Sequence, residues 1–248
     1  MKNSMQQNIG ILGYGEIGKA IEKFYQDPIR YKISIADKDF DRLASDLNIL
    51  HVCIPDSKDF KKIILHIASK HNPEYIVIHS TVKVGTTKWL NERLNKVVHS
   101  PCMGVHPNLY EGIKTFKKFI GCDDIGIGGV IQDHFNEIGI EETEVVIDSR
   151  NTELGKLLDT TYYGLCISYH GYINDLCKKL DLDFNTVATD FNETYNWGYS
   201  RLGMPQVIRP VLKAPENKIG GHCIIPNAKI LMKQFGINNI LKSILKYK

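Results

Sequence analysis

The sequence predicts an α/β fold: an abbreviated, doubly wound, mostly parallel sheet followed by a smaller all-helical domain. Short apolar runs alternate with helical patterns as far as Asp148, which is typical of a parallel sheet with crossover helices. A long helical pattern without proline then runs from Thr152 to Leu180, and we expect only helices and loops after it. These observations predict two domains, residues 1–150 and 151–248, with a boundary near residues 149–151.

The first elements can be assigned in order. The apolar run Asn8 to Leu12 ends in glycines and precedes a helical pattern from Ile17 to Phe24, which predicts a strand, a tight turn and a helix. A second strand is predicted at Tyr31 to Asp37 and a third at Asn48 to Pro55. Residues 38–47 are too few for the helix and strand that a doubly wound half usually has there, so we expect an abbreviated sheet.

The alternation continues after the third strand. The expected elements are a helix at 58–71, a strand at 75–82, a helix at 86–94, a strand at 96–100, an apolar segment at 118–122, a helix around 131–138 and a strand at 144–148. Apolar residues among lysines at 227–248 indicate one amphipathic helix, or a pair, packed on the core.

Composition excludes several functional classes. Of 248 residues, 43% are hydrophobic and 24% charged, and the net charge is only +3, so nothing favours nucleic acid or a membrane surface as a partner. No apolar run approaches the roughly 18 residues of a membrane span, and residues 1–8 lack a secretory pattern, so we expect a cytoplasmic protein. The six cysteines contain no CxxC pair and are expected to be reduced, and no metal site is predicted.

A dinucleotide fingerprint follows the first strand. It has the pattern G-x-G-x-x-G and comprises Gly13, Tyr14, Gly15, Glu16, Ile17 and Gly18. The glycines allow a tight turn, close approach of a pyrophosphate and close helix packing, as in a Rossmann domain. Asp37 ends the next strand, where its carboxylate can bind ribose hydroxyls and repel a 2′-phosphate, so NAD is favoured over NADP. Lys38 weakens that preference, and the alternative is a glycine-rich turn that binds nothing.

Three further motifs carry a resemblance to a known family. They are Ile76 to Thr87 (IVIHSTVKVGTT), Glu153 to Lys156 (ELGK) and Gly220 to Cys223 (GGHC). With the fingerprint, and in this order, they make the chain similar to the UDP-glucose/GDP-mannose dehydrogenases, which have a fold like that of 6-phosphogluconate dehydrogenase. The resemblance implies a Rossmann domain and a helical domain. It also implies a shortened form that lacks the family's C-terminal nucleotide-sugar-binding domain.

The resemblance implies specific roles for residues of this chain. The family oxidises a sugar-nucleotide alcohol to an acid in two hydride transfers. Cys223 corresponds to the nucleophile that holds the aldehyde, Lys156 to the lysine that stabilises an alkoxide, and Thr81 to the threonine at the nicotinamide. Pro55 and Ser80 are assigned with Thr81 to the cofactor site.

Other positions depart from the family pattern. Thr160 replaces an asparagine, Asn227 replaces an aspartate, and Cys102 and His106 stand where the family has two glutamates. An amide cannot act as a general base as a carboxylate can. These departures argue against the hydrolytic half of the reaction, and a single two-electron step is compatible with them.

Two other functions are compatible with the sequence. One is a nonenzymatic NAD-binding module, in which Cys223 is an inert thiol and Lys156 a solvated helix residue. The other is a dehydrogenase or reductase of a small hydroxy or keto acid that uses His106, because prephenate dehydrogenases have a similar His-Pro pair. Whether the enzyme acts on a sugar nucleotide or on a hydroxy or keto acid, the partner is a small-molecule substrate. A homodimer through the helical domain, built on residues 152–180, is a further expectation from the resemblance.

Overall fold

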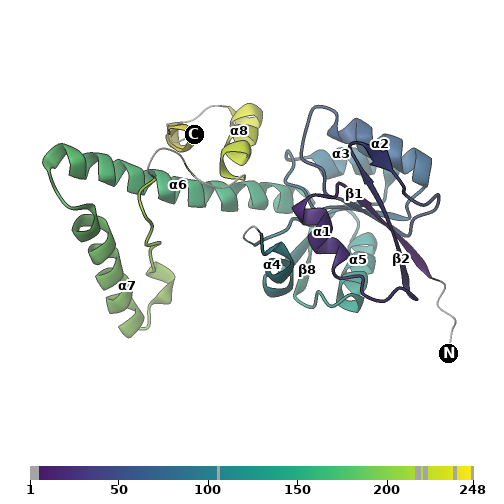
Figure 1. The fold of residues 1–248 in the computed structure, drawn as a ribbon, viewed down its shortest axis with the longest axis horizontal. Coiled ribbons are helices and arrows are strands. Elements are labelled where there is room, and N and C mark those ends of the chain that lie inside the picture. The colour runs from purple at the N-terminus through teal and green to yellow at the C-terminus, as the bar shows by residue number, and fades with distance from the viewer. Residues whose placement is uncertain (1–5, 105–106, 216–218, 220–222, 237–238, 247–248) are drawn as a thin grey trace. The chain divides into compact units, whose positions relative to one another are not determined.

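The computed structural model describes residues 6–104, 107–215, 219, 223–236 and 239–246. The chain divides into two compact units, Met1–Lys156 and Leu157–Lys248. The first unit contains the sheet and its covering helices, and the second contains helices (Figure 1). Each unit is described separately below.

The first unit is built on one eight-stranded sheet. Its strands are β1 (Gln7–Leu12), β2 (Tyr31–Asp37), β3 (Phe40–Asp41), β4 (Ile49–Val52), β5 (Tyr75–Ile78), β6 (Val97–His99), β7 (Lys118–Cys122) and β8 (Thr143–Ile147). Their order is β3-β2-β1-β4-β5-β6-β7-β8, and all neighbours are parallel except β2 with β3 and β6 with β7. The predicted fold class is therefore confirmed. Because β2 and β4 flank β1, the sheet has the switch point at which α/β proteins bind ligands.

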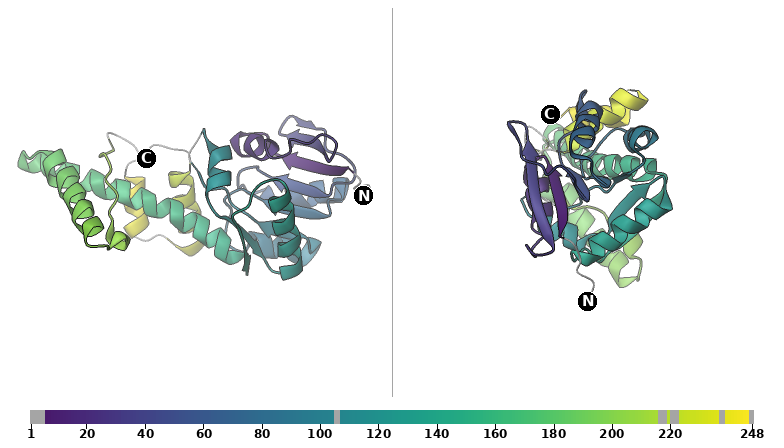
Figure 2. Two further views of the ribbon diagram at one scale, coloured as in Figure 1. Left: turned by 90° about the horizontal axis from the view of Figure 1, so that it is seen from below. Right: turned by 90° about the vertical axis from the view of Figure 1, so that its right-hand side faces the viewer.

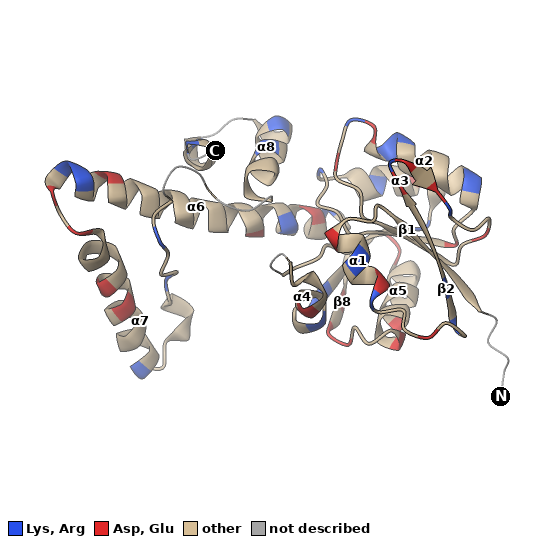
Figure 3. Cartoon of the chain, in the orientation of Figure 1, with Lys and Arg blue, Asp and Glu red and all other residues tan. Residues whose placement is uncertain are grey.

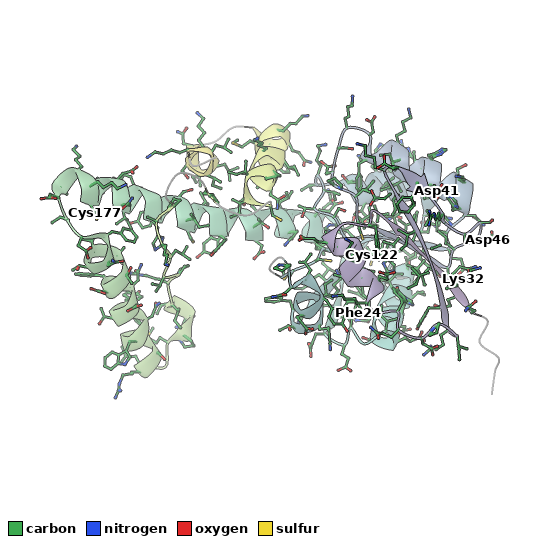
Figure 4. The ribbon with its side chains drawn as sticks, in the orientation of Figure 1. Phe24, Lys32, Asp41, Asp46, Cys122 and Cys177 are labelled. Atoms are coloured by element: carbon green, nitrogen blue, oxygen red, sulfur yellow. The ribbon has the colours of Figure 1, made fainter. Side chains whose placement is uncertain are left out.

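The expected abbreviation lies between β2 and β4. Residues 38–48 are all described and form no helix, and their single strand, β3, pairs two residues with the end of β2. Asp41 of β3, labelled in Figure 4, accepts hydrogen bonds from Lys70 at 2.6 Å and from Nε2 of His71 at 2.9 Å. Burial alone would raise the pKa of Asp41, but the bonds from Lys70 and His71, the backbone bond from Leu43 and the Coulomb interaction with His71 together lower the pKa to about 2. The hairpin is thereby attached to the end of a helix.

Helices cover both faces of the sheet (Figure 2). Those of the first unit are α1 (Glu16–Glu22), α2 (Phe60–His71), α3 (Thr86–Leu94), α4 (Leu109–Thr115) and α5 (Ile125–Glu137). One core lies against α1 and α5 and includes Phe24 and Cys122, both labelled in Figure 4. A second core lies against α2 and α3 and includes Phe60 and Leu90. Alternate residues of one strand serve the two cores, as the twofold period of a strand requires.

Several predicted bounds need correction. The predictions for β2 and α3 have the observed bounds, but α4 was missed and α5 begins six residues before the predicted helix at 131. The strands predicted at 48–55 and 75–82 are shorter than predicted. The polypeptide turns away from the sheet at its carboxyl edge, after residue 52 in the first case and after residue 78 in the second. These turns carry residues of the candidate site.

The second unit is helical, and its first helix begins in the first unit. Its elements are α6 (Arg150–Leu180), a π-helical segment (Asn185–Asp190), α7 (Phe191–Arg201), a short 3-10 turn (Pro205–Val207), α8 (Ile224–Phe235) and α9 (Asn239–Leu245). The last two are the amphipathic pair expected at the C-terminus. Their core contains Ile224 and Ile244, and a Cβ on Gly164 of α6 would lie 2.4 Å from the Ile224 side chain. Among the residues described, no helix is both long and apolar enough to cross a bilayer.

Candidate functional site

The turn between β1 and α1 has the geometry that its glycines predict. Gly13 has a φ of 96°, which favours glycine, and a Cβ there would lie 2.8 Å from the backbone nitrogen of Ile54. A Cβ on Gly18 would lie 2.2 Å from the carbonyl oxygen of Gly13. By contrast, no described atom outside residues 14–16 lies within 4 Å of the position that a Cβ on Gly15 would take. Gly13 and Gly18 are required by the fold, whereas Gly15 leaves space open at the start of α1.

Asp37 is attached to this turn through its carboxylate. Its Oδ2 accepts a hydrogen bond from the backbone N–H of Tyr14 at 2.7 Å, and its Oδ1 accepts one from the N–H of Lys38 at 2.7 Å. The bonds from Lys38 and Tyr14 lower the pKa of Asp37, so the group is anionic at neutral pH. The Lys38 side chain is exposed. The predicted acidic residue therefore lies beside the glycine turn, as the fingerprint requires.

The turns after β4 and β5 meet at the same edge of the sheet. The hydroxyl of Ser80 donates a hydrogen bond to the carbonyl oxygen of Ile54 at 2.5 Å. Ser80 is buried, Thr81 is half-buried, and Pro55 is exposed. The residues predicted for the cofactor site thus lie at the carboxyl ends of four neighbouring parallel strands, β2, β1, β4 and β5, which share one edge.

Glu153 joins two of the motifs that carried the resemblance. It is fully buried and accepts hydrogen bonds from the N–H of Gly85 at 2.5 Å, the N–H of Thr87 at 2.8 Å and the Thr87 hydroxyl at 2.7 Å. Burial raises the pKa of Glu153, and these bonds oppose the increase. The carboxylate supplies a cap for α3, whose own N-cap residue, Gly85, has no side chain. The ELGK motif is therefore attached to the VGTT segment, a structural role that the sequence prediction missed.

Lys156 and Thr160 lie one turn apart on α6, and both are half-buried. Lys156 belongs to the first unit. Burial lowers the pKa of His99 to about 3, and the charges of Lys118 and Lys156 contribute to the decrease. The charge of Lys156 therefore acts on buried groups next to the carboxyl edge of β6.

A buried lysine holds the turn after β6. Lys118 is 2% exposed, and its Nζ donates hydrogen bonds to the carbonyl oxygens of Ser100 at 2.7 Å and Pro101 at 3.0 Å. Nζ also lies 3.2 Å from Nδ1 of His79 and 3.4 Å from Sγ of Cys102, one of the positions where the resemblance has a glutamate, so four acceptors surround its three N–H groups. The sequence prediction missed Lys118, because it is the second of two adjacent lysines at the start of a strand, and lysines are usually exposed. Alternation along that strand was the only available signal.

Cys223 and Asn227 lie on the first turn of α8 in the second unit. Cys223 is the N-cap residue and is exposed, and its carbonyl oxygen accepts a hydrogen bond from the N–H of Asn227 at 3.0 Å. The side chain of Asn227 is buried, and its Nδ2 has no hydrogen-bond partner within the described part of the chain. His106 and the Gly220-Gly221-His222 segment lie outside the described residues. The described residues contain no group of three or more His, Cys, Asp or Glu side chains that could hold a metal ion.

Comparison with known proteins supports the resemblance. No protein-family model matches the sequence. The chain is 24% identical over 197 residues to a UDP-glucose 6-dehydrogenase of Campylobacter jejuni, an alignment that covers 77% of this chain and 46% of that protein. The chain thus spans about half the length of this curated relative.

Solved structures with the same fold include three dehydrogenases. A UDP-D-ManNAc dehydrogenase from Pyrococcus horikoshii superposes with a TM-score of 0.71 and 13% identity, over 97% of this chain and 68% of that one. A UDP-glucose dehydrogenase from Pyrobaculum islandicum gives a TM-score of 0.71 and 16% identity, over 100% and 69%. A 3-hydroxyisobutyrate dehydrogenase from Mycobacterium tuberculosis gives 0.70 and 12%, over 97% and 91%. The predicted resemblance is thereby confirmed: the chain has the fold of the UDP-sugar dehydrogenases and is similar in sequence to one of them.

Proposed function

We propose that the chain is an NAD-dependent oxidoreductase that oxidises a sugar nucleotide or a related sugar alcohol. The observation that carries the proposal is the glycine turn with Asp37 attached to it. Gly15 leaves the approach to the turn open, and the carboxylate of Asp37 stands beside it in anionic form. NAD, when bound, supplies the acceptor for a hydride.

The residues of the turn fit a dinucleotide in two ways. The open side of Gly15 admits a pyrophosphate, because Gly15 has no side chain and no described residue outside 14–16 comes within 4 Å of its Cβ position. Each carboxylate oxygen of Asp37 accepts one backbone bond and keeps further lone pairs for the ribose hydroxyls. A 2′-phosphate at the same place would meet this negative charge, which is the reason for proposing NAD rather than NADP.

The substrate half of the proposal rests on the resemblance. Lys156 would stabilise the alkoxide that forms as a substrate hydroxyl loses its proton, and Thr81 would lie at the nicotinamide. Cys223 is exposed, so its sulfur can form a bond to a carbonyl carbon while the carbonyl π electrons move to oxygen and the thiol proton is transferred to that oxygen. Nδ2 of Asn227, which has no partner among the residues described, can donate a hydrogen bond to such an oxygen but cannot act as a base. Asn227 therefore supports a two-electron oxidation.

Thermal stability with added ligands tests the cofactor. A ligand at 100 times its Kd stabilises the native state by about 2.7 kcal/mol. We expect NAD to raise the melting temperature of the wild type more than NADP does, and Asp37→Ala to remove this difference. Asp39→Ala is the matched control, because Asp39 is an exposed aspartate two residues away. No shift with either dinucleotide would contradict the proposal.

The substrate class is tested with UDP-sugars, GDP-sugars and free sugar acids, by the melting shift of each and by its turnover with NAD. Turnover that survives Cys223→Ser unchanged would remove the thiol from the mechanism. A shift with NAD and no turnover of any panel member would favour the nonenzymatic NAD-binding module.

A small hydroxy acid is the second candidate substrate. The chain covers 91% of the 3-hydroxyisobutyrate dehydrogenase structure, against 69% or less of the two UDP-sugar dehydrogenases described above. A melting shift with 3-hydroxy acids, and none with nucleotide sugars, would select this alternative.

We also propose that α6 forms a homodimer contact. Residues 160–174 of α6 contain no Lys, Arg, Asp or Glu, which leaves the middle of the helix uncharged in Figure 3. This stretch nevertheless exposes large side chains, with Tyr162 and Tyr169 each 63% accessible. Light scattering on the full chain should give twice the monomer mass, and Tyr169→Glu should reduce it. A monomeric wild type at micromolar concentration would overturn this proposal.

A further inference from the structure

Five buried side chains on the face covered by α1 and α5 form one continuous row. Nε2 of His134 lies 2.7 Å from the hydroxyl of Tyr25, which lies 2.5 Å from Nε2 of His51. Nδ1 of His51 lies 2.8 Å from Nε2 of His79, and Nδ1 of His79 lies 3.2 Å from Nζ of Lys118. None of the five side chains is more than 6% exposed. The row is therefore shielded from water along its length.

The row crosses the sheet from one edge to the other. At one end, His134 lines a surface pocket together with residues from the amino ends of three strands: Gln7, Asn48, Ile49, Glu74 and Tyr75. At the other end, Lys118 holds the turn that follows the carboxyl end of β6. The carboxyl edge of the sheet is thus connected to a pocket at the opposite edge.

Every member between the two ends is neutral at pH 7. Burial lowers the pKa of His51 and His79 well below the usual histidine value, and it lowers that of His134 to about 4. Burial also raises the pKa of Tyr25 well above its usual value. Each neutral imidazole has one N–H donor and one acceptor nitrogen, and the phenol can donate and accept. Each member can therefore donate to one neighbour and accept from the other.

Two arrangements of protons satisfy the row. In the first, Lys118 donates to Nδ1 of His79, His79 donates to Nδ1 of His51, His51 donates to Tyr25, and Tyr25 donates to His134. In the second, the bonds among the rings and the phenol are reversed, and the N–H at Nδ1 of His79 points to a backbone carbonyl oxygen 2.9 Å away. Lys118 carries one proton fewer in the second arrangement than in the first.

We propose that Lys118 exchanges its proton with solvent through this row. In the outward direction a proton leaves Nζ of Lys118 for Nδ1 of His79, and the proton on Nε2 of His79 moves to Nδ1 of His51. The proton on Nε2 of His51 moves to the Tyr25 oxygen, and the Tyr25 proton moves to Nε2 of His134. The proton on Nδ1 of His134 passes to water in the pocket. Five N–H or O–H bonds break and five form, so one proton is released and no electron is transferred.

The exchange determines whether Lys118 carries a charge beneath the carboxyl edge of the sheet. The titratable groups that face Lys118, besides the row itself, are Cys53, Cys102, His99 and Lys156. Lys156 is the residue to which the proposed function assigns the alkoxide, so a change in the charge of Lys118 would act on the same reaction. This consequence rests on the proposed function, whereas the exchange itself does not.

Tyr25→Phe is the substitution that interrupts the row, because it removes the single hydroxyl between His51 and His134. Tyr31→Phe is the matched control. The two rings lie 5.1 Å apart, and the Tyr31 hydroxyl is also buried but has no hydrogen-bond partner among the residues described. Both variants therefore lose one buried hydroxyl from the same aromatic cluster, and only one of them breaks the row.

The measurement is the exchange of the ring N–H of His79 after transfer of the full chain into D2O, followed by NMR with 15N-labelled histidine. It needs neither NAD nor substrate, so its result is independent of the proposed function. We expect Tyr25→Phe to slow this exchange at least tenfold and Tyr31→Phe to leave it within twofold of the wild type. Backbone amide exchange of β5 is measured in the same samples to report on opening of the core.

The direction of the change distinguishes conduction from a structural role. A hydroxyl that only stabilises the core would, when removed, speed the exchange of His79 and of the β5 amides together. Unchanged or faster exchange at His79 in Tyr25→Phe overturns the proposal. If Tyr25→Phe fails to fold, His134→Leu interrupts the row at its outer end, and the same slowing is required.

Discussion

Alanine at two positions of the glycine turn should separate folding from cofactor binding. A Cβ on Gly18 would lie 2.2 Å from a backbone carbonyl oxygen, which cannot move without distorting the end of β1. Overpacking of this kind costs about 1–3 kcal/mol. For a chain of this size 1 kcal/mol corresponds to about 2–4 °C, so Gly18→Ala should lower the melting temperature by about 2–12 °C.

Gly15→Ala, by contrast, should keep the stability of the fold and weaken NAD binding. The φ of Gly15 is −78°, which alanine adopts without strain, and no described atom outside residues 14–16 lies within 4 Å of its Cβ position. We therefore expect stability within about 1 kcal/mol of the wild type, because alanine also reduces the entropy of the unfolded chain. The new methyl group would occupy the open side of the turn and weaken NAD binding by about 1–3 kcal/mol, or about 5- to 150-fold in Kd.

Thermal melting followed by circular dichroism gives the stability of both variants, and isothermal titration calorimetry gives their affinity for NAD. Two results would refute the reasoning. One is a loss of stability in Gly15→Ala as large as that in Gly18→Ala. The other is wild-type affinity for NAD in a stable Gly15→Ala protein.

Two further perturbations follow from buried or paired carboxylates. Glu153→Ala should cost about 2–4 kcal/mol in urea denaturation, because buried donors at the start of α3 lose their acceptor, whereas Glu153→Gln should recover part of the loss. Equal losses in the two variants would contradict the hydrogen-bond explanation. The pKa of Asp41 is about 2 in the folded state, below its value in the unfolded chain, so its contribution to stability is present above about pH 4 and is lost as the pH falls toward 2. Asp41→Asn should therefore reduce the acid dependence of the urea midpoint between pH 5 and 2.5, and identical slopes in wild type and variant would exclude this role.

The sheet could be predicted largely from local signals. The strand at Tyr31–Asp37 and the helix at Thr86–Leu94 are bounded by turn-forming residues, and their observed bounds are those predicted. The helix at Leu109–Thr115 was missed because it is short and contains Gly112. A Cβ there would lie 2.6 Å from the carbonyl oxygen of Met103, a close approach between segments that local propensity does not reveal.

The candidate site was predictable only in part. Glycine spacing and Asp37 are read along the chain, and their geometry follows from a single strand, turn and helix. The roles of Glu153 and Lys118 depend on which strands become neighbours. His51 and His79 occupy otherwise apolar positions on β4 and after β5, where alternation predicts core residues. Hydrogen bonding between them needs the pairing of β4 with β5, which periodicity does not specify.

The shortness of strand β3 affects how well the protein resists aggregation. β3 pairs with Ala36 and Asp37, and the N–H of Arg42 donates a further hydrogen bond to the carbonyl oxygen of Ile35, so among the described residues the part of β2 before Ile35 is an edge of the sheet. A free edge is a template on which a foreign strand can pair and aggregate. Lys32, labelled in Figure 4, is exposed on that part of β2 and places a charge where a second strand would dock. The charges of Lys32 and of Arg42 beside it therefore guard this border, where a longer crossover would have provided a covering element.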